Sequence, residues 1–301
     1  MRALASVMAA APEPGEAKGY GLSSIAEIPE YITHHLEDSR VVEFAGFYLD
    51  LSRFAVTPIH LGSVAIDLSP TRQLIFIFLA AFLCIAIFVP VARALRRTRT
   101  AGAAPSGFAN AAEALVIFFR DNVVRANIGH GADFYTPYIL TVFFFILFMN
   151  VLGLTPFGIT ATGNLSVTAA LAIIAFVVVE VSGVMALGAG GYMRTIFFAP
   201  HGLPLPLKVI MALVMAPVEF LGKLTKPFAL AVRLFANMMA GRVLILAMVG
   251  VVLVAQSYLV GGATVVALTI LMILKLFIAL LQAYVFSMLT SVFIGLIRHA
   301  H

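Results

Sequence analysis

The sequence predicts an all-α integral membrane protein, and three observations support this fold class. Hydrophobic residues make up 62% of the 301 positions, charged residues make up 11%, and the mean hydropathy is +1.06, whereas soluble domains are closer to an even balance. Several apolar runs reach the roughly 20 residues that a helix needs to cross about 30 Å of hydrocarbon. The alternating pattern of outer-membrane strands is absent. We therefore expect about five membrane-spanning helices.

Residues 1–72 are predicted to form an extracytoplasmic segment ahead of a membrane domain over residues 73–301. The segment carries five basic and nine acidic side chains, whereas the rest of the chain is mainly basic. Those basic residues lie between or inside apolar runs, so membrane topology explains them better than nucleic-acid binding. Residues 1–17 resemble either a signal peptide or a flexible tail.

No cofactor or metal site is expected. His34 and His35 lie beside two acidic residues, but adjacent residues point in different directions on a helix. A solvated, partner-facing helix is therefore favoured there over a metal site. The single cysteine, Cys84, lies in an apolar run, which excludes a disulfide framework and a thiol metal site.

The first span is predicted over residues 73–92. Four arginines follow it, and the positive-inside rule places them in the cytoplasm (Arg93, Arg96, Arg97 and Arg99). The amino end then lies outside, and an odd number of spans places the carboxyl end inside. Residues 108–127 are too polar to span, so we expect an amphipathic helix at the cytoplasmic interface, with a buried connector as the alternative.

Four further spans are expected along the chain. Their ranges are 138–154, 165–187, 207–255 and 264–297. The range 207–255 is far longer than one membrane crossing and contains Pro217 and Pro227. Two helical pieces, or one long tilted and kinked helix, fit that region better than a single upright span.

Arg233 is the most informative residue, because it lies inside an apolar run and its guanidinium keeps its proton at any relevant pH. A permanent charge at this depth needs an acidic partner or a water-filled cavity. Glu219 lies fourteen residues earlier, about 20 Å along a continuous helix, which is too far for a direct pair. Glu180 belongs to another helix. A partner from another subunit is therefore favoured over a Glu180–Arg233 pair.

Other polar residues accompany Arg233 within the last two spans. Asn237 falls on the same helical face as Arg233, whereas Arg242 falls on the opposite face. Lys275 and Gln282 lie two turns apart on one face of the final helix. Hydrogen bonding between helices is one explanation for Gln282, but it does not account for Lys275.

These residues belong to segments that resemble subunit a of the F-type ATP synthase, the stator beside the rotating c-ring. The matching segments are RDNVVRANIG, FMNVLGLTPFG, NLSVT, KPFALAVRLFANMMAG and LLQAYVFSMLTSVF. Glu219, ahead of the Lys226–Pro227 pair, also fits the pattern. The resemblance covers about residues 73–298.

The resemblance implies that Arg233 faces the c-ring carboxylate between two offset aqueous half-channels. It implies that Asn237 and Gln282 help to orient the arginine, and that Glu219 belongs to the half-channel open to the cytoplasm. Arg242 and Lys275 depart from the family, which usually has Glu or His at these positions. We therefore expect Glu180 to supply the titratable group of the outer half-channel, with neutralisation of a buried cation as the alternative role.

The resemblance also implies a location and partners. It places the protein in a bacterial inner membrane, in contact with lipid, the c-ring, the peripheral-stalk subunit b and the other ATP synthase subunits. Protons or sodium ions would be transported, and nucleotide chemistry would belong to other subunits, because the chain has no Walker loop. A secondary transporter and a scaffold without transport are the alternatives. The first lacks an inverted repeat, and the second leaves Arg233 unexplained.

Overall fold

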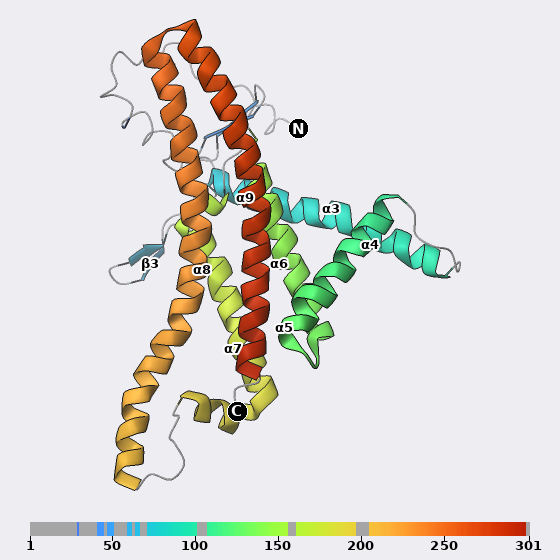
Figure 1. Ribbon diagram of the computed structural model, residues 1–301, viewed down its shortest axis with the longest axis vertical. Coiled ribbons are helices and arrows are strands. Elements are labelled where there is room, and N and C mark those ends of the chain that lie inside the picture. The colour runs from blue at the N-terminus through green and yellow to red at the C-terminus, as the bar shows by residue number, and fades with distance from the viewer. Residues whose placement is uncertain are drawn as a thin grey trace. The chain divides into compact units, whose positions relative to one another are not determined.

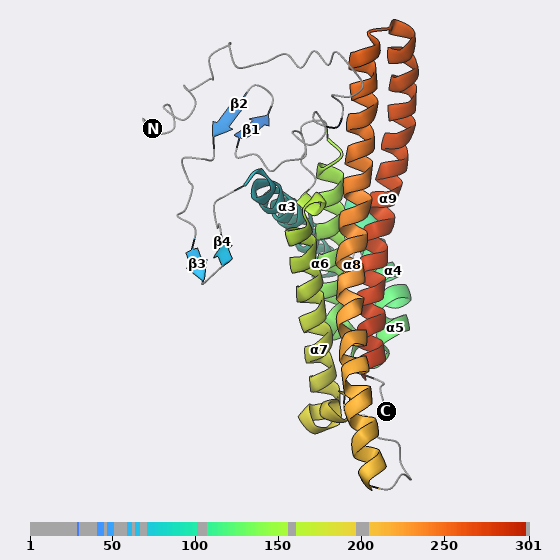
Figure 2. The same cartoon turned by 90° about the vertical axis from the view of Figure 1, so that its left-hand side faces the viewer.

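The computed structural model describes residues 29, 41–44, 47–50, 59–61, 64–66, 71–100, 107–155, 161–196 and 205–298. The predictions for residues 1–17 and for His34 and His35 lie outside these described residues. Near the amino end, β1 (Val41–Phe44) pairs antiparallel with β2 (Phe47–Asp50), and β3 (Ile59–Leu61) pairs with β4 (Val64–Ile66) (Figure 2). The sequence does not predict these hairpins, because strands of three or four residues are too short for a recognisable alternation.

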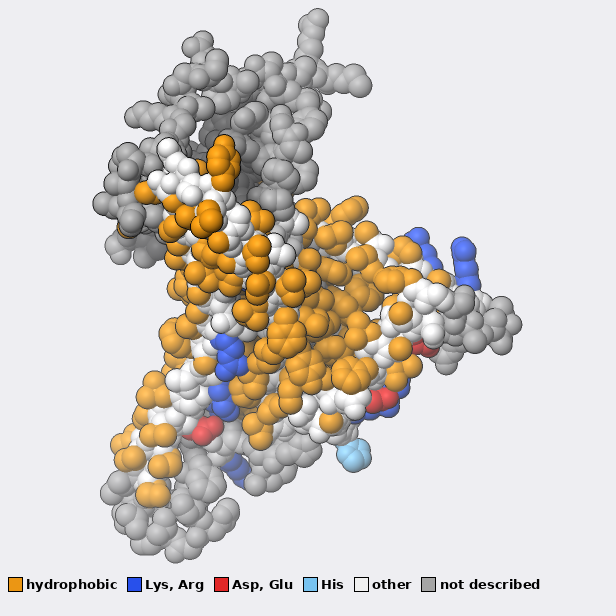
Figure 3. Space-filling view, turned by 45° about the horizontal axis from the view of Figure 1, so that its top comes forward, with side chains coloured by type: hydrophobic (Ala, Val, Ile, Leu, Met, Phe, Trp, Pro, Cys, Tyr) orange, Lys and Arg blue, Asp and Glu red, His pale blue; other side chains and the backbone are white. Residues whose placement is uncertain are grey.

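Among the described residues, five helices are long and apolar enough to cross a membrane, which confirms the predicted fold class. They are α3 (Arg72–Thr100), α6 (Ala132–Leu152), α7 (Leu165–Ile196), α8 (Leu205–Ala255) and α9 (Tyr258–Arg298) (Figure 1). Large apolar side chains on them are exposed, including Phe78 and Phe82, and apolar side chains dominate the face shown in Figure 3. Such surfaces suit contact with lipid.

The helices extend beyond the predicted spans. Helix α3 continues through the arginine cluster, α6 begins six residues before residue 138, and α9 begins six residues before residue 264. Helix α7 has a non-helical residue, Gly188, directly after the predicted end of its span at residue 187. An apolar run marks the stretch that suits hydrocarbon, whereas backbone hydrogen bonding continues into the polar region. Helix α8 is one helix of 51 residues with Pro217 and Pro227 inside it, so the single long helix is the correct alternative. Its length is about 76 Å at 1.5 Å per residue.

Residues 108–128 are helical throughout, as predicted. They form α4 (Phe108–Phe119), the π-helical η3 (Arg120–Arg125) and α5 (Ala126–Ile128). One face is buried through Phe119, Val123 and Val124, whereas Leu115 and Phe118 are exposed. This segment is therefore amphipathic, and its place at the membrane interface stays a prediction.

An ionic network links this segment to the start of α6. Arg125 donates hydrogen bonds to Asp133 and Asp121, and Arg120 donates to Asp121. The hydrogen bond from Arg120, together with the charge of Arg125, holds the pKa of the Asp121 carboxyl below its usual range. Asp121 therefore stays ionised at physiological pH, and the network contributes a constant, exposed link rather than a titrating one.

The chain divides into two compact units. One consists of residues 83–148, 162–236 and 280–301, and the other of residues up to 82, 149–161 and 237–279. A hydrophobic cluster in the former unit joins η3, α5, α6, α7 and α9, with Val124, Ile128, Tyr135, Ile139, Val179 and Ile294 as members. In the latter unit the carboxyl-terminal part of α8 and the amino-terminal part of α9 run side by side as an antiparallel pair (Figures 1 and 2).

Candidate functional site

Arg233 lies on an exposed face of α8. Its exposed neighbours three or four residues away are Ala229, Ala236 and Asn237, and Ala240 is exposed seven residues later, whereas Leu230, Ala231, Leu234 and Met238 are buried. Residues three and four apart share a helix face, so the arginine lies on a surface built mainly of small side chains. No ion pair or hydrogen bond joins the Arg233 side chain to another residue that the structure describes. The described part of the chain therefore supplies no counter-ion for it.

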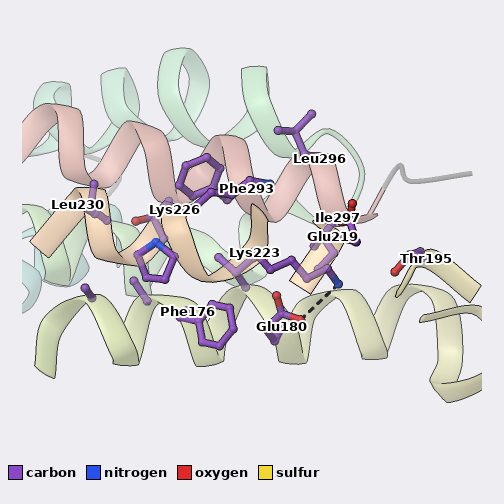
Figure 4. Close-up of a pocket in the computed structure, with 15 residues that line it drawn as sticks. Phe176, Glu180, Thr195, Glu219, Lys223, Lys226, Leu230, Phe293, Leu296 and Ile297 are labelled. Atoms are coloured by element: carbon purple, nitrogen blue, oxygen red, sulfur yellow. Dashed lines mark ion pairs between the residues drawn. The ribbon is translucent and has the colours of Figure 1, made fainter. Parts of the chain in front are cut away.

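A cavity of about 120 Å³ with both apolar and charged lining residues lies between α7, α8 and α9 (Figure 4). Its charged lining residues are Glu180, Glu219, Lys223 and Lys226, and its other lining residues include Phe176, Thr195, Thr290 and Phe293. A buried water needs about 10–15 Å³ and two or more polar partners. The cavity therefore has room for several waters and the polar groups to hold them.

Glu180 is held in this cavity by two side chains. The hydroxyl of Tyr192 donates a hydrogen bond to the Glu180 carboxylate. The Lys223 ammonium lies 3.7 Å from the same carboxylate oxygen, with side-chain exposures of 10% for Lys223 and 18% for Glu180. Lys223 also donates to the Tyr192 hydroxyl over 3.2 Å and lies 4.3 Å from the centroid of the tyrosine ring. The low exposure limits screening of this ion pair by water.

The cation beside Glu180 differs from those that the sequence suggested. From the sequence, a Glu180–Arg233 pair was the less favoured alternative, and Arg242 and Lys275 were the other cations that Glu180 could neutralise. The structure places Lys223 beside Glu180 instead. Glu180 also shares its cavity with Glu219, the residue assigned to the half-channel open to the cytoplasm. The two glutamates that were predicted to belong to different half-channels therefore line one cavity.

Helix α8 presents the other charged residues of the cavity along one face. Glu219, Lys223 and Lys226 are spaced four and three residues apart, which aligns them. No hydrogen bond or ion pair joins Glu219 to another described residue, and Lys226 lies 5.3 Å from the ring centroid of Phe293. The cavity is thus lined by Glu180, which lies in an ion pair with Lys223, and by Glu219, which has no such partner among the described residues.

A second cavity, of about 240 Å³, brings together Asn237, Gly241 and Lys275 in the other unit. A Cβ at Gly241 would lie 2.7 Å from Cε of Lys275, so the glycine makes room for the lysine side chain. The charge of Arg242 acts on Lys275. Asn237 and Lys275, which the sequence singled out separately, therefore line one space with a second cation nearby.

Gln282 is buried on α9, with 1% of its surface exposed. It belongs to the same unit as Arg233. Burial of an amide in an apolar helix fits a side chain that forms hydrogen bonds inside the bundle. Its part in orienting the arginine stays a prediction.

Sequence reasoning missed Tyr192 and Lys223. Lys223 carried a recognisable signal, because it is a charged residue one helical turn after Glu219 in an apolar helix. Tyr192 carried no recognisable signal, since it lies twelve residues after Glu180 and contacts it only because α7 changes direction at Gly188.

In the described part of the chain, no group of three or more His, Cys, Asp or Glu side chains could hold a metal ion.

Fold and site together define a multi-pass helical membrane protein with an exposed arginine and a charged cavity within its spans. Comparison with known families matches residues 74–295 to the family described as ATP synthase A chain. The chain belongs to that family.

Curated relatives agree with this assignment. ATP synthase subunit a 2 of Chlorobaculum tepidum is 40% identical over 291 residues, which cover 95% of this chain and 79% of the relative. ATP synthase subunit a of Anaeromyxobacter dehalogenans is 39% identical over 304 residues, covering 97% and 76%. ATP synthase subunit a of Chlorobium phaeobacteroides is 39% identical over 283 residues, covering 94% and 78%.

Proposed function

We propose that this chain is the ion-translocating stator subunit of an ATP synthase, with Arg233 facing a carboxylate of the rotating c-ring. The observation that carries the proposal is the exposed position of Arg233 without a counter-ion among the described residues. An arginine at mid-bilayer costs from about 3 to more than 10 kcal/mol. A carboxylate from a neighbouring subunit, or water in a channel, would offset that cost, and the small side chains around Arg233 allow close approach.

In this mechanism the arginine both attracts the c-ring carboxylate and blocks direct passage. A carboxylate that arrives protonated from the lipid loses its proton to one half-channel when it meets the fixed positive charge. It then passes the arginine and takes a proton from the other half-channel before it re-enters lipid. The driving force is about 2.3 kcal/mol per charge per 100 mV of membrane potential, and the permanent charge prevents its loss by direct leakage.

The two cavities supply candidates for the two half-channels. Glu219 would exchange protons on the cytoplasmic side, in the cavity that it shares with Glu180. The second cavity, with Asn237 and Lys275 and with Arg242 nearby, would belong to the outer half-channel. Gln282 would help to orient Arg233.

The assembly and orientation follow from the same proposal. Residues 1–72 would lie outside a bacterial inner membrane and the carboxyl end in the cytoplasm, with the c-ring, subunit b and lipid around the spans. The chain would perform no catalysis itself, because nucleotide chemistry would belong to other subunits of the complex. The transported ion would be a proton or a sodium ion.

The test is Arg233→Ala in the whole complex, reconstituted in vesicles and compared with wild type and Arg93→Ala. Arg93 is an exposed arginine on a different helix, α3. With normal assembly, we expect Arg233→Ala to abolish ATP-driven ion pumping and ATP synthesis driven by an imposed potential, while Arg93→Ala retains both. Full coupled transport by Arg233→Ala would overturn the proposal.

A further inference from the structure

The end of α7 turns back toward the cavity at Gly188. This residue has φ 71° and ψ 163°, a conformation that is essentially restricted to glycine. In a straight helix, residues twelve apart would be separated by about 18 Å, more than a tyrosine side chain spans. The turn therefore makes possible the contact between Tyr192 and Glu180.

Three side chains then satisfy one another. The Tyr192 hydroxyl donates to Glu180 and accepts from Lys223, while Lys223 lies beside both the carboxylate and the tyrosine ring. Hydrogen bonds that involve an ionised group are stronger than neutral ones, and these are only slightly exposed. The trio, which we term the clamp, joins the returning end of α7 to α8.

The clamp also forms part of the cavity. Thr195, three residues beyond Tyr192, lines the cavity opposite residues of α8 and α9 (Figure 4). The other charged groups that face this space are Glu219 and Lys226, both from α8. The returning segment, residues 189–196, therefore contributes Thr195 to the wall of the space in which Glu219 would exchange its proton.

We propose that Tyr192 and Lys223 are positioning residues, which fix the Glu180 carboxylate and hold the returning end of α7 as a wall of this cavity. The inference rests on the proposed function, because the wall matters to activity only if ions pass through the cavity. Loss of the clamp would let residues 189–196 move and would leave Glu180 free to compete with Glu219 for protons. Ion transfer through the cavity would then slow in both directions.

The experiment measures coupled transport and wall position in the intact complex. Transport is measured as ATP-driven pumping and as ATP synthesis, in Tyr192→Phe, Lys223→Met and Lys223→Arg. Wall position is measured as the rate at which a membrane-impermeant maleimide labels Thr195→Cys. Cys84 is the single cysteine of the chain, so Cys84→Ala provides a clean background. Arg194→Gln is the matched control, because Arg194 is an exposed cation on the same short segment.

We expect Tyr192→Phe and Lys223→Met each to lower transport by about tenfold, on the scale of a lost hydrogen bond to a charged group, and to accelerate labelling. Lys223→Arg should keep transport and the labelling rate near wild type, since it keeps the charge. Adding Glu180→Gln to Lys223→Met should cause no further loss of transport.

Wild-type transport and labelling in Tyr192→Phe and Lys223→Met would overturn the inference, as would a loss of transport of equal size in Arg194→Gln. If Lys223→Met assembles poorly, Tyr192→Phe still tests the inference, because it removes only the hydroxyl oxygen of the side chain. If Arg233→Ala fails to transport while the clamp variants behave as wild type, the stator role stands and the clamp is wrong.

Discussion

Arg233 and Glu219 lie on the same helix in different surroundings. Both side chains are exposed, but the arginine lies among small side chains, whereas Glu219 also lines a cavity with Lys223 and Lys226. A fixed charge on a surface suits an encounter with a moving partner, and a carboxylate beside a water-sized space suits proton exchange. These different surroundings fit the two roles proposed for α8, the encounter of Arg233 with a rotor carboxylate and proton exchange at Glu219.

Glu219→Gln tests the second role. The amide cannot take up and release a proton at neutral pH, so we expect ATP-driven pumping and ATP synthesis to fall by about 100-fold, the lower end of what a positioned acid or base contributes. Glu219→Asp should retain part of the activity. Glu113→Gln, a half-buried glutamate of α4, serves as control. Unchanged transport in Glu219→Gln would remove this residue from the pathway.

The sequence sufficed to single out the ionisable residues that lie in an apolar setting. Arg233, Glu219 and Lys275 stand out in any apolar run, because ionisable groups there are costly. The partner of Glu180 could not be found in this way. The contact of Tyr192 with Glu180 depends on the change of direction at Gly188. The glycines of residues 188–191 predict a loop there, but they do not predict that Tyr192 returns to Glu180.

At the scale of elements, close packing of α9 against α5 depends on glycine. A Cβ at Gly295 would overlap the backbone carbonyl of Asn127, so Gly295→Ala must push the two segments apart. Overpacking of this kind costs about 1–3 kcal/mol. We expect a lower thermal midpoint for the complex, measured by loss of pumping after heating. Gly222→Ala is the control, because a Cβ at this helical position meets nothing within 4 Å. An unchanged midpoint in Gly295→Ala would contradict the packing described here.

The bounds of the helices were partly predictable. The start of α7 and the end of α8 were predicted to the residue, because glycine, polar and uncharged turn residues mark both. The extension of α3 was not, since hydropathy follows the hydrocarbon layer while a helix continues as long as its backbone hydrogen bonds do. The predicted end of the third span at residue 187 coincides with the change of direction at Gly188. The continuity of α8 through Pro217 and Pro227 likewise lies beyond propensity arguments, which assign each proline a break.

For the whole molecule, composition alone was enough to predict the class. A chain with 62% hydrophobic residues and five long apolar runs is not expected to fold as a soluble domain. The family match over residues 74–295 agrees with this prediction. The hairpins near the amino end could not be predicted, because four very short strands leave no periodic signal. The orientation and the half-channels stay predictions that follow from charge and resemblance.

The most direct test of the central claim is disulfide cross-linking between the Arg233 face and the c-ring in the assembled complex. Ala236→Cys, in a Cys84→Ala background, places a thiol on the exposed face one turn after Arg233, and a second cysteine is introduced beside the membrane carboxylate of the c subunit. The account predicts a cross-linked product that stops rotation-coupled pumping and is reversed by reduction, with none from Ile85→Cys on the exposed surface of α3. Absence of the Ala236 product in a complex that assembles and pumps would contradict the claim that this face meets the rotor.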